Sequence, residues 1–324
     1  MKVSIIMPVY NAASTLHETL ESINSQTFRD FELVCVNDCS KDESEALLNE
    51  YAEAVDFPVR IISHEVNQGA AAARNTGLDA AEGEYLVFVD ADDRMAPETL
   101  EKAMAEVGRT GADIVGWDWL LSMTQNERYM RQADYASPLD ALKNMMSGVM
   151  RWNLWLFLSK RALWKDNGVR FLPGMNMGED MMVMHKLFCC AESVCQIHEA
   201  LYHYNAVNVS SISRQFSESN RMQVSTNVAE VERYVVSSRY AEALSGYPEM
   251  LKLNIKLPLL VSGSKEDYRL WRTWYTEADA FVMANKSLPL RKRLLQKAAT
   301  WRLWPVVKAY YLLVEKFVYG IIFR

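Results

Sequence analysis

The 324-residue chain is poor in cysteine and histidine and carries no excess of positive charge. Its five cysteines are odd in number and include no CxxC pair, which argues against a disulfide framework or a cysteine-rich zinc site. The formal net charge of -6 argues against nucleic-acid binding. The apolar stretch at residues 3–7 is followed at once by Pro8 and is too short for the core of a signal peptide. These shortages predict a cytoplasmic protein with reduced thiols.

The first 112 residues alternate four times between strand and helix patterns. Apolar runs predict strands at residues 3–7, 31–36, 58–63 and 84–89, and helical patterns fill residues 14–26, 40–55 and 69–81 between them. Pro97 then begins another helix. This order, with short links, predicts a parallel sheet built from βαβ units.

Beyond residue 112 the pattern loosens. It predicts a strand at 113–121, a helix at 138–150, an extended segment at 152–158, a helix at 181–190, and one or two strands at 194–204. Mainly helices are expected from 217 to 285. The predicted fold class is therefore α/β, a Rossmann-like, mostly parallel sheet flanked by helices, with a helical C-terminal extension.

Residues 85–93 are the most informative stretch. A buried apolar strand pattern runs directly into Asp90, Asp92 and Asp93. Ligands of open α/β sheets bind at the carboxyl ends of strands, and grouped carboxylates favour Mg²⁺ or Mn²⁺. The alternative is an acidic turn that caps the next helix, and this stretch alone does not separate the two.

Four segments together carry a family resemblance. They are Pro8-Val9-Tyr10-Asn11, residues 36–42 (VNDCSKD), residues 67–77 (NQGAAAARNTG) and residues 88–93 (FVDADD). Their order and spacing resemble family 2 glycosyltransferases, inverting enzymes with the GT-A fold, over roughly residues 1–205. One departure is visible, because the second segment reads Asn37-Asp38-Cys39-Ser40 where the family usually has Asp-Asp-Gly-Ser.

The resemblance implies a division of labour along the chain. It implies a nucleotide-sugar-binding half at 1–112, an acceptor-binding half with the catalytic base at 113–215, and a helical C-terminal region at 216–324. Tyr10 offers a flat face to a nucleobase, Asp38 can accept from an imide N–H, and Arg74 can bond the base or the diphosphate. Each also has a structural alternative: packing for Tyr10, a helix N-cap for Asp38 and a surface position for Arg74. The full set implied to bind the nucleotide sugar is Pro8, Tyr10, Asn11, Asp38, Gly69, Arg74, Asn75, Asp90, Ala91, Asp93, His203 and Arg214.

The resemblance also implies the catalytic groups. Asp92, with Asp90, would ligate Mn²⁺ or Mg²⁺ against the diphosphate. Asp180 would act as the general base and Glu179 would orient the acceptor or steady Asp180. The alternative for the Glu179-Asp180 pair is simple stabilisation of the start of a helix.

The last forty residues are basic and aromatic, with nine Lys and Arg residues between 285 and 324 against the single acidic Glu315. Charged residues interrupt the apolar runs, so a spanning helix is not expected. From residue 288 on, the pattern predicts an amphipathic helix on an anionic membrane surface, which would make the protein peripheral on the inner face of the cytoplasmic membrane. Packing of this helix on the domain, or a homodimer contact, is the alternative.

The sequence thus predicts a metal-dependent, inverting glycosyltransferase of the hexosyltransferase type. It would move one sugar from a nucleotide sugar, preferably a UDP-sugar, to a glycan or lipid-linked acceptor in surface polysaccharide or lipopolysaccharide biosynthesis. A sugar-phosphate nucleotidyltransferase would carry a Gly-rich, basic signature after the first strand, which residues 8–11 lack. A haloacid-dehalogenase-type phosphatase would carry its Asp-x-Asp loop after the first strand. A non-catalytic nucleotide-binding or membrane-scaffold protein is the remaining rival, and Asp92 and Asp180 argue against it.

Overall fold

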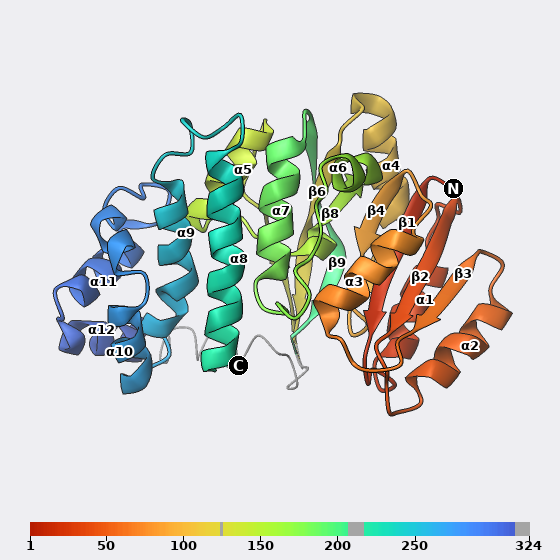
Figure 1. Cartoon of the computed structure of the whole chain (residues 1–324), viewed down its shortest axis with the longest axis horizontal. Helices are drawn as coiled ribbons and strands as arrows, with labels where there is room; N and C mark the ends of the chain where they lie inside the picture. The colour runs from red at the N-terminus through yellow and green to blue at the C-terminus, as the bar shows by residue number, and fades with distance from the viewer. Residues whose placement is uncertain (124–125, 207–216, 315–324) are drawn as a thin grey trace. The chain divides into compact units, whose positions relative to one another are not determined.

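The computed structural model describes residues 1–123, 126–206 and 217–314 (Figure 1). The chain forms two compact units. Unit 1 comprises residues 1–140 and 152–235, and unit 2 comprises residues 141–151 and 236–324. The three-part division into donor, acceptor and C-terminal regions concerns function and stays a prediction.

Unit 1 is built on a mixed sheet, in which the described residues form nine strands in the order β3-β2-β1-β4-β8-β6-β9-β5, with β7 paired to β6. The strands β1 to β4 are parallel, as predicted, and β6 and β9 are also parallel. The strand β8 lies antiparallel between β4 and β6. The strand bounds are β1 Val3–Val9, β2 Phe31–Asn37, β3 Val59–Ser63, β4 Tyr85–Phe88, β5 Arg94–Met95, β6 Ile114–Ser122, β7 Glu127–Met130, β8 Phe157–Lys160 and β9 Val194–Asn205.

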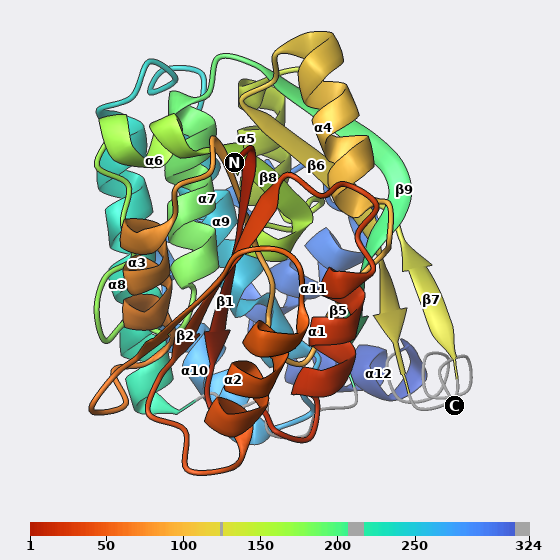
Figure 2. The ribbon, with the colours of Figure 1, turned by 90° about the vertical axis from the view of Figure 1, so that its right-hand side faces the viewer.

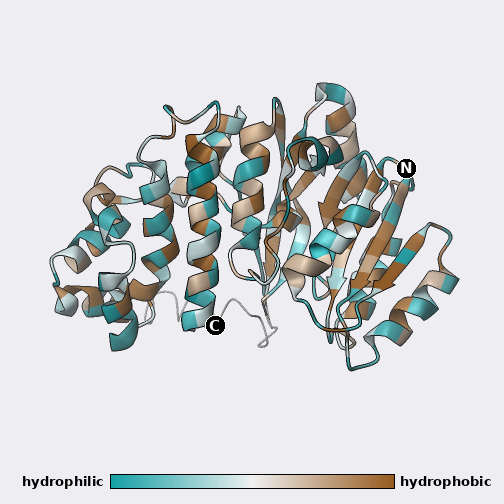
Figure 3. Ribbon diagram, in the orientation of Figure 1, coloured by the Kyte–Doolittle hydropathy of each residue, from teal (hydrophilic) through white to brown (hydrophobic). Residues whose placement is uncertain are grey.

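Helices cover both faces of this sheet. The helix α3 packs on β1 and β2 on one face, while α1 and α4 lie on the other (Figure 2). The central strands are coloured as hydrophobic ribbon (Figure 3), because strands buried on both faces need apolar residues at successive positions. The helix bounds are α1 Leu16–Asn24, α2 Ser44–Ala54, α3 Ala70–Ala80, α4 Thr99–Thr110, α5 Pro138–Ser147, α6 Arg161–Asp166, α7 Glu179–Cys190 and α8 Glu218–Val236.

The parallel register brings the predicted motifs to one edge of the sheet. Val9 of β1 pairs with Asn37 of β2, and Ile6 pairs with Phe88 of β4. The residues that follow these strand ends are Tyr10, Asp38 and Asp90. They are separated by tens of residues in sequence and yet lie at neighbouring strand ends, as expected for an open α/β sheet.

The segment predicted as extended at 152–158 is only partly so. Leu154–Leu156 forms a 3-10 helix (η1), and the extended strand β8 begins at Phe157. The tight turn directs the backbone N–H of Leu154 toward the Asp180 carboxylate, at 3.3 Å from Oδ2. An apolar pattern does not distinguish a strand from such a turn, because both bury consecutive side chains.

Unit 2 is helical in its described residues, which confirms the helical C-terminal extension. Its elements from residue 236 on are α9 Tyr247–Lys256, η3 Leu257–Leu260, α10 Lys265–Thr273, η4 Thr276–Phe281, α11 Leu290–Thr300 and α12 Trp304–Tyr310. The single amphipathic helix predicted from residue 288 is wrong for the described part: Arg302, with a φ of 60°, lies in a turn that separates α11 from α12. Residues 315–324 of this prediction lie outside the described residues.

The two last helices are partly buried within unit 2. Leu295, Ala299 and Val307 are almost fully buried, and the ring of Trp304 stacks on Tyr268 at 5.4 Å. Other apolar side chains point to solvent, namely Leu290, Leu294, Trp301, Leu303, Val306, Leu312 and Leu313. No helix in the described ranges is long and apolar enough to cross a membrane.

Candidate active site

The three aspartates after β4 have different surroundings. Asp93 is buried and accepts hydrogen bonds from the Tyr202 hydroxyl (2.9 Å) and the Asn205 backbone N–H (2.7 Å), both on β9. The Asp90 backbone N–H donates to the same Tyr202 oxygen at 3.2 Å. Burial, together with the neighbouring charges of Asp90 and Asp92, raises the pKa of Asp93 well above its ordinary value. Asp93 therefore anchors the loop to β9.

The second acidic pair begins α7, as the sequence predicted. Gly178 precedes it with a φ of 77°, a conformation that glycine adopts without strain. Glu179 and Asp180 are directed inward to Arg74 of α3, which is itself only 6% exposed. Burial and the adjacent Asp180 raise the pKa of Glu179 to about 8. Burial also raises the pKa of Asp180, and Arg74 opposes that rise.

One guanidinium thus connects the two acidic motifs. Arg74 Nη2 lies 3.0 Å from Asp90 Oδ1, and Nη1 lies 2.7 Å from Glu179 Oε1 and 3.2 Å from Asp180 Oδ1. Burial alone would lower the pKa of Arg74, but the three carboxylates outweigh it and raise the pKa. The surface alternative for Arg74 is wrong. The acidic motifs at residues 90–93 and 179–180, far apart in sequence, are thus joined in one charge cluster around a buried arginine.

The loop after β2 holds Asp38 firmly. Its Oδ1 lies 2.7 Å from His64 Nδ1 and accepts from the Gln68 N–H, while Oδ2 accepts from the Gly69 N–H at 2.7 Å. An ionised carboxylate has about four lone-pair sites, so one position on Oδ2 remains for a ligand N–H. Cys39 has a φ of 62° where the family usually places glycine, so the departure is accommodated at a left-handed position.

Residues of the first motif flank this loop. Pro8 lies within β1, and the Tyr10 side chain is half exposed. Asn11 braces the Asp38 loop, since its Oδ1 accepts from the Lys41 N–H at 2.7 Å and its own N–H donates to Ser40 Oγ. The Ala91 carbonyl accepts from the Thr15 hydroxyl at 3.0 Å.

The third motif packs closely against the chain before α7. Gly69 has a φ of 87°, and a Cβ built there would lie 2.3 Å from Asn176 Nδ2. The Asn75 side chain forms two hydrogen bonds with the backbone of Phe171. Its Nδ2 donates to the carbonyl oxygen (2.9 Å), and its Oδ1 accepts from the N–H (3.1 Å). Gly69 is therefore required for close approach, and Asn75 connects α3 to the segment that leads into α7.

Of the two softer candidates, only His203 is described, and it is not part of this cluster. His203 lies on β9 opposite Arg94 of β5, with Nδ1 3.3 Å from Glu127 Oε1. Arg214 lies outside the described residues. Both assignments to the nucleotide-sugar site stay predictions.

Three residues of the site escaped the sequence reasoning. His64 bridges Asp38 and Thr76, Tyr202 connects Asp90 to Asp93, and Asn176 Oδ1 accepts from the Ala71 N–H at the start of α3. His64 directly follows β3, so the strand-end rule that found Asp38 could have found it. Nothing in the local pattern around Tyr202 or Asn176 indicates these long-range contacts.

The carboxylates of the loop after β4 suit a divalent cation that is also bound by a ligand. In the described ranges no group of three or more His, Cys, Asp or Glu side chains forms a complete metal cage. Mg²⁺ and Mn²⁺ are commonly held by one or two carboxylates plus substrate phosphates rather than by an all-protein cage. Asp90 and Asp92, two carboxylates of one loop after β4, could hold a cation in that arrangement.

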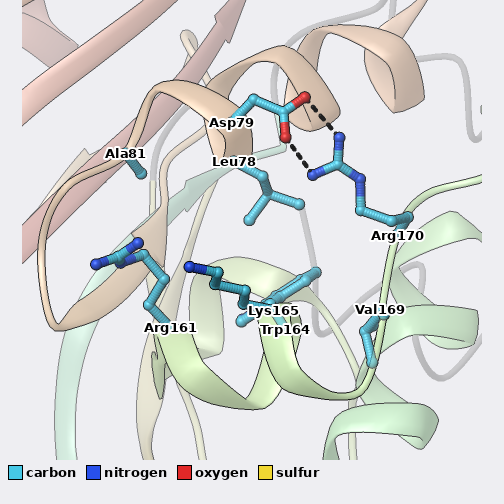
Figure 4. A pocket seen from close by; sticks show the side chains of 9 residues that line it. Leu78, Asp79, Ala81, Arg161, Trp164, Lys165, Val169 and Arg170 are labelled. Atoms are coloured by element: carbon cyan, nitrogen blue, oxygen red, sulfur yellow. Dashed lines mark hydrogen bonds and ion pairs between the residues drawn. The ribbon is translucent and has the colours of Figure 1, made fainter.

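A hollow of about 310 Å³ lies away from these motifs (Figure 4). It is lined by residues of α3 and α6 and by Arg170, which pairs with Asp79 through two bonds of 2.6 Å. None of the predicted site residues lines it. The candidate site therefore rests on the convergence of motifs at the strand ends and not on the size of a hollow.

Comparisons with known proteins agree with this geometry. The sequence pattern of Glycosyl transferase family 2 matches residues 4–188, more than half of the chain. The chain is 26% identical to the uncharacterized glycosyltransferase EpsJ of Bacillus subtilis, over 95% of both chains. It is also 29% identical to the poly(ribitol-phosphate) beta-N-acetylglucosaminyltransferase TarS of Staphylococcus aureus, over 63% of this chain and 35% of TarS.

Solved structures show the same fold. Residues 1–349 of S. aureus TarS in complex with UDP-GlcNAc superpose with a TM-score of 0.71 at 22% identity, over 99% of this chain and 92% of that one. The mannosyltransferase PcManGT of Pyrobaculum calidifontis, in complex with GDP-Man and Mn²⁺, gives a TM-score of 0.55 at 19% identity, over 96% and 87% of the two chains. The structural likeness confirms the predicted GT-A architecture, and the family match extends across all four motifs and Asp180. The chain belongs to glycosyltransferase family 2.

Proposed function

We propose that this family 2 glycosyltransferase is an inverting enzyme that moves one sugar from a UDP-sugar to a hydroxyl of a glycan or lipid-linked acceptor. The observation that carries the proposal is the charge cluster in which Asp90 after β4 and Asp180 of α7 share one buried arginine. A donor-side and a base-side carboxylate at one site are what a single displacement at an anomeric carbon requires. The likeness to TarS, whose structure holds UDP-GlcNAc, supports a UDP-sugar donor.

The uracil of the donor would lie at the ends of β1 and β2. Asp38 has one acceptor position left on Oδ2, which suits the imide N–H of uracil, and the exposed ring of Tyr10 offers a stacking face. Guanine and cytosine lack an imide between two carbonyl groups. Asp38 therefore suits a uracil or thymine base, and the likeness to TarS in complex with UDP-GlcNAc supports uracil.

Asp92 and Asp90 would hold Mn²⁺ or Mg²⁺ against the two phosphates. The bound cation would supply charge stabilisation to the departing nucleoside diphosphate. The complex of PcManGT with GDP-Man and Mn²⁺ supports this assignment. Asp93 contributes indirectly, by fixing the loop through Tyr202 and Asn205.

Asp180 is the proposed general base. Its Oδ1 is buried and has no hydrogen-bond partner, although it lies 3.2 Å from Arg74, whereas Oδ2 lies 3.3 Å from the Leu154 N–H. A lone pair of Oδ1 that the ion pair with Arg74 leaves unused can take the proton of the acceptor hydroxyl as its oxygen attacks the anomeric carbon. The bond to the diphosphate oxygen breaks on the opposite side, the electron pair leaves with UDP, and the configuration inverts.

The setting proposed for this reaction is cell-surface glycopolymer synthesis at the inner face of the cytoplasmic membrane. TarS is named for a polymer acceptor, which supports the first part. For the second part, seven large apolar side chains of α11, α12 and their flanks are exposed, and they account for half of the fourteen such side chains in the described chain.

Charge complementarity selects an anionic bilayer as the partner of this surface. Residues 286–314 contain seven Lys and Arg residues and no acidic residue. Exposed Trp and Leu side chains interleaved with cations suit the interface of an anionic membrane. We name residues 290–313 the basic apolar surface.

A donor screen with purified protein tests the proposed function. We expect Mn²⁺-dependent release of UDP from one or more UDP-sugars, and no release of GDP from GDP-mannose. Isothermal titration with UDP provides a readout that does not need the acceptor. Failure of UDP to bind in the presence of Mn²⁺ would refute the proposal.

A further inference from the structure

Arg74 is the residue whose surroundings differ most from its predicted role. The sequence suggests a ligand of the base or the diphosphate, yet the side chain is buried and directed to three carboxylates. Both terminal nitrogens are engaged: Nη1 by the Glu179-Asp180 pair and Nη2 by Asp90. The Nε N–H is buried without a hydrogen-bond partner, so the three carboxylates take up the charge of the guanidinium and both of its terminal nitrogens, but not every N–H.

The guanidinium of Arg74 also packs against an aromatic ring. Its central carbon lies 5.8 Å from the ring centre of Phe171, and that ring contacts Phe88, the last residue of β4, at 5.9 Å. Asn75, the residue after Arg74, holds the backbone of Phe171 through two hydrogen bonds. The Arg74-Asn75 pair therefore ties α3 to the strand that carries Asp90 and to the segment that leads to Asp180.

We propose that Arg74 is a positioning residue that sets the separation of the donor-side carboxylate Asp90 and the base Asp180, and that it does not bind the diphosphate. The inference rests on the proposed function, because it assigns these two carboxylates to opposite sides of the transferred sugar. A planar, forked guanidinium suits this task, because it holds two carboxylates in fixed directions at once. Lysine, a single point charge on a flexible stem, does not.

The test compares Arg74→Lys with Arg170→Lys. Both substitutions retain a positive charge, and Arg170 is an exposed arginine that also forms a two-bond carboxylate pair, with Asp79. We expect Arg74→Lys to lower kcat for UDP release from UDP-GlcNAc by about tenfold to 100-fold, the range expected for a misplaced reacting group. The Kd for UDP and the KM for UDP-GlcNAc should stay within about threefold of wild type, and Arg170→Lys should change none of the three values.

Asn75→Ala provides a second variant that leaves all charges in place. It releases Phe171 and should also lower kcat while UDP binds as before. A diphosphate-binding Arg74 predicts the reverse for Arg74→Lys, a Kd for UDP raised about tenfold or more. That outcome, or an unchanged kcat in Arg74→Lys, would overturn the inference. Wild-type protein that neither binds UDP nor releases it from UDP-GlcNAc would instead refute the proposed function.

Discussion

The charged side chains of the candidate site in unit 1 are largely buried, whereas those of the basic apolar surface of unit 2 are exposed or half-buried. In unit 1 the carboxyl groups of Asp90, Glu179 and Asp180 contact a single buried cation, Arg74. In the helices α11 and α12, cations stand beside exposed apolar side chains and no acidic residue occurs. Buried charge of one sign is costly to keep unless it serves a ligand, whereas exposed charge costs little. The first region is therefore suited to chemistry and the second to a surface.

The largest expected effect separates chemistry from binding within unit 1. Asp180→Asn removes the proton acceptor and should lower kcat by about 10³-fold or more, while the Kd for UDP stays within about threefold. Because the pKa of Asp180 is raised, the wild-type rate should fall on the acid side at a pH above the ordinary range of aspartate. UDP release and isothermal titration measure both effects. Asp166→Asn on the exposed side of α6 is the matched control, and retained turnover in Asp180→Asn would remove Asp180 as the base.

Loss of the metal ligand should come next. Asp92→Asn is expected to lower UDP release by about 10²-fold, since a bound divalent cation supplies several kcal/mol to the departing diphosphate. Titration of UDP with and without Mn²⁺ gives a second readout, in which the gain in affinity caused by Mn²⁺ should be lost in the variant. Chelation of wild-type protein should mimic the substitution. An equal Mn²⁺ effect in both proteins would contradict the role of Asp92.

The third prediction concerns the basic apolar surface. Arg291→Gln, Lys292→Gln and Arg293→Gln combined should weaken binding to vesicles rich in anionic lipid by roughly 100-fold, at about 1 kcal/mol for each cation near the surface. Co-sedimentation measures it, and UDP binding should not change. A parallel variant, Trp301→Ser with Leu313→Ser, tests the apolar part, with the exposed Met222→Ser of α8 as control. If both variants still bind vesicles as the wild type does, the basic apolar surface is not the membrane-binding site.

The smallest effect is on stability and depends on pH. His185 in α7 is buried, which lowers its pKa to about 4 from 6.5. In the unfolded chain it takes up a proton as pH falls through 6.5, and the folded protein does so only near pH 4, so stability is lost between these values as pH falls. Between pH 7 and pH 5 this loss should be about 2 kcal/mol in the free energy of unfolding. Urea unfolding of wild type and His185→Leu at both pH values checks it, and an equal pH dependence in the two proteins would contradict it.

Local sequence pattern was enough for the parallel half of the sheet. The predicted strands around β1 to β4 agree with the structure to within one or two residues, because apolar runs and polar strand ends are set by neighbours in sequence. The same rule placed Tyr10, Asp38 and Asp90 at one edge. The break between α11 and α12 at Arg302 was missed, although Pro305, in the first turn of α12, is a helix-start signal.

The parts of the site that could not be predicted are long-range. Arg74 bonds Glu179 across 105 positions, and Asp93 bonds Tyr202 across 109. Asp93 could bind a ligand or hold its loop in place, depending on which β9 side chain contacts it. The residues around Asp93 in sequence do not indicate that contact. The spacing of the motifs predicts which residues belong to the candidate site, and the contacts in the folded chain show which of them hold the loops in place.

The Tyr202 contact also has an optical consequence. The Tyr202 ring stacks on the indole of Trp155 at 4.5 Å with an interplanar angle of 9°, and Tyr204 stacks on the same indole at 5.5 Å. The Tyr202 hydroxyl donates to the Asp93 carboxylate and accepts from the Asp90 backbone N–H. Trp155 is therefore linked to the acidic loop through Tyr202. We expect a change at this loop to alter the emission of Trp155, one of the nine tryptophans of the chain.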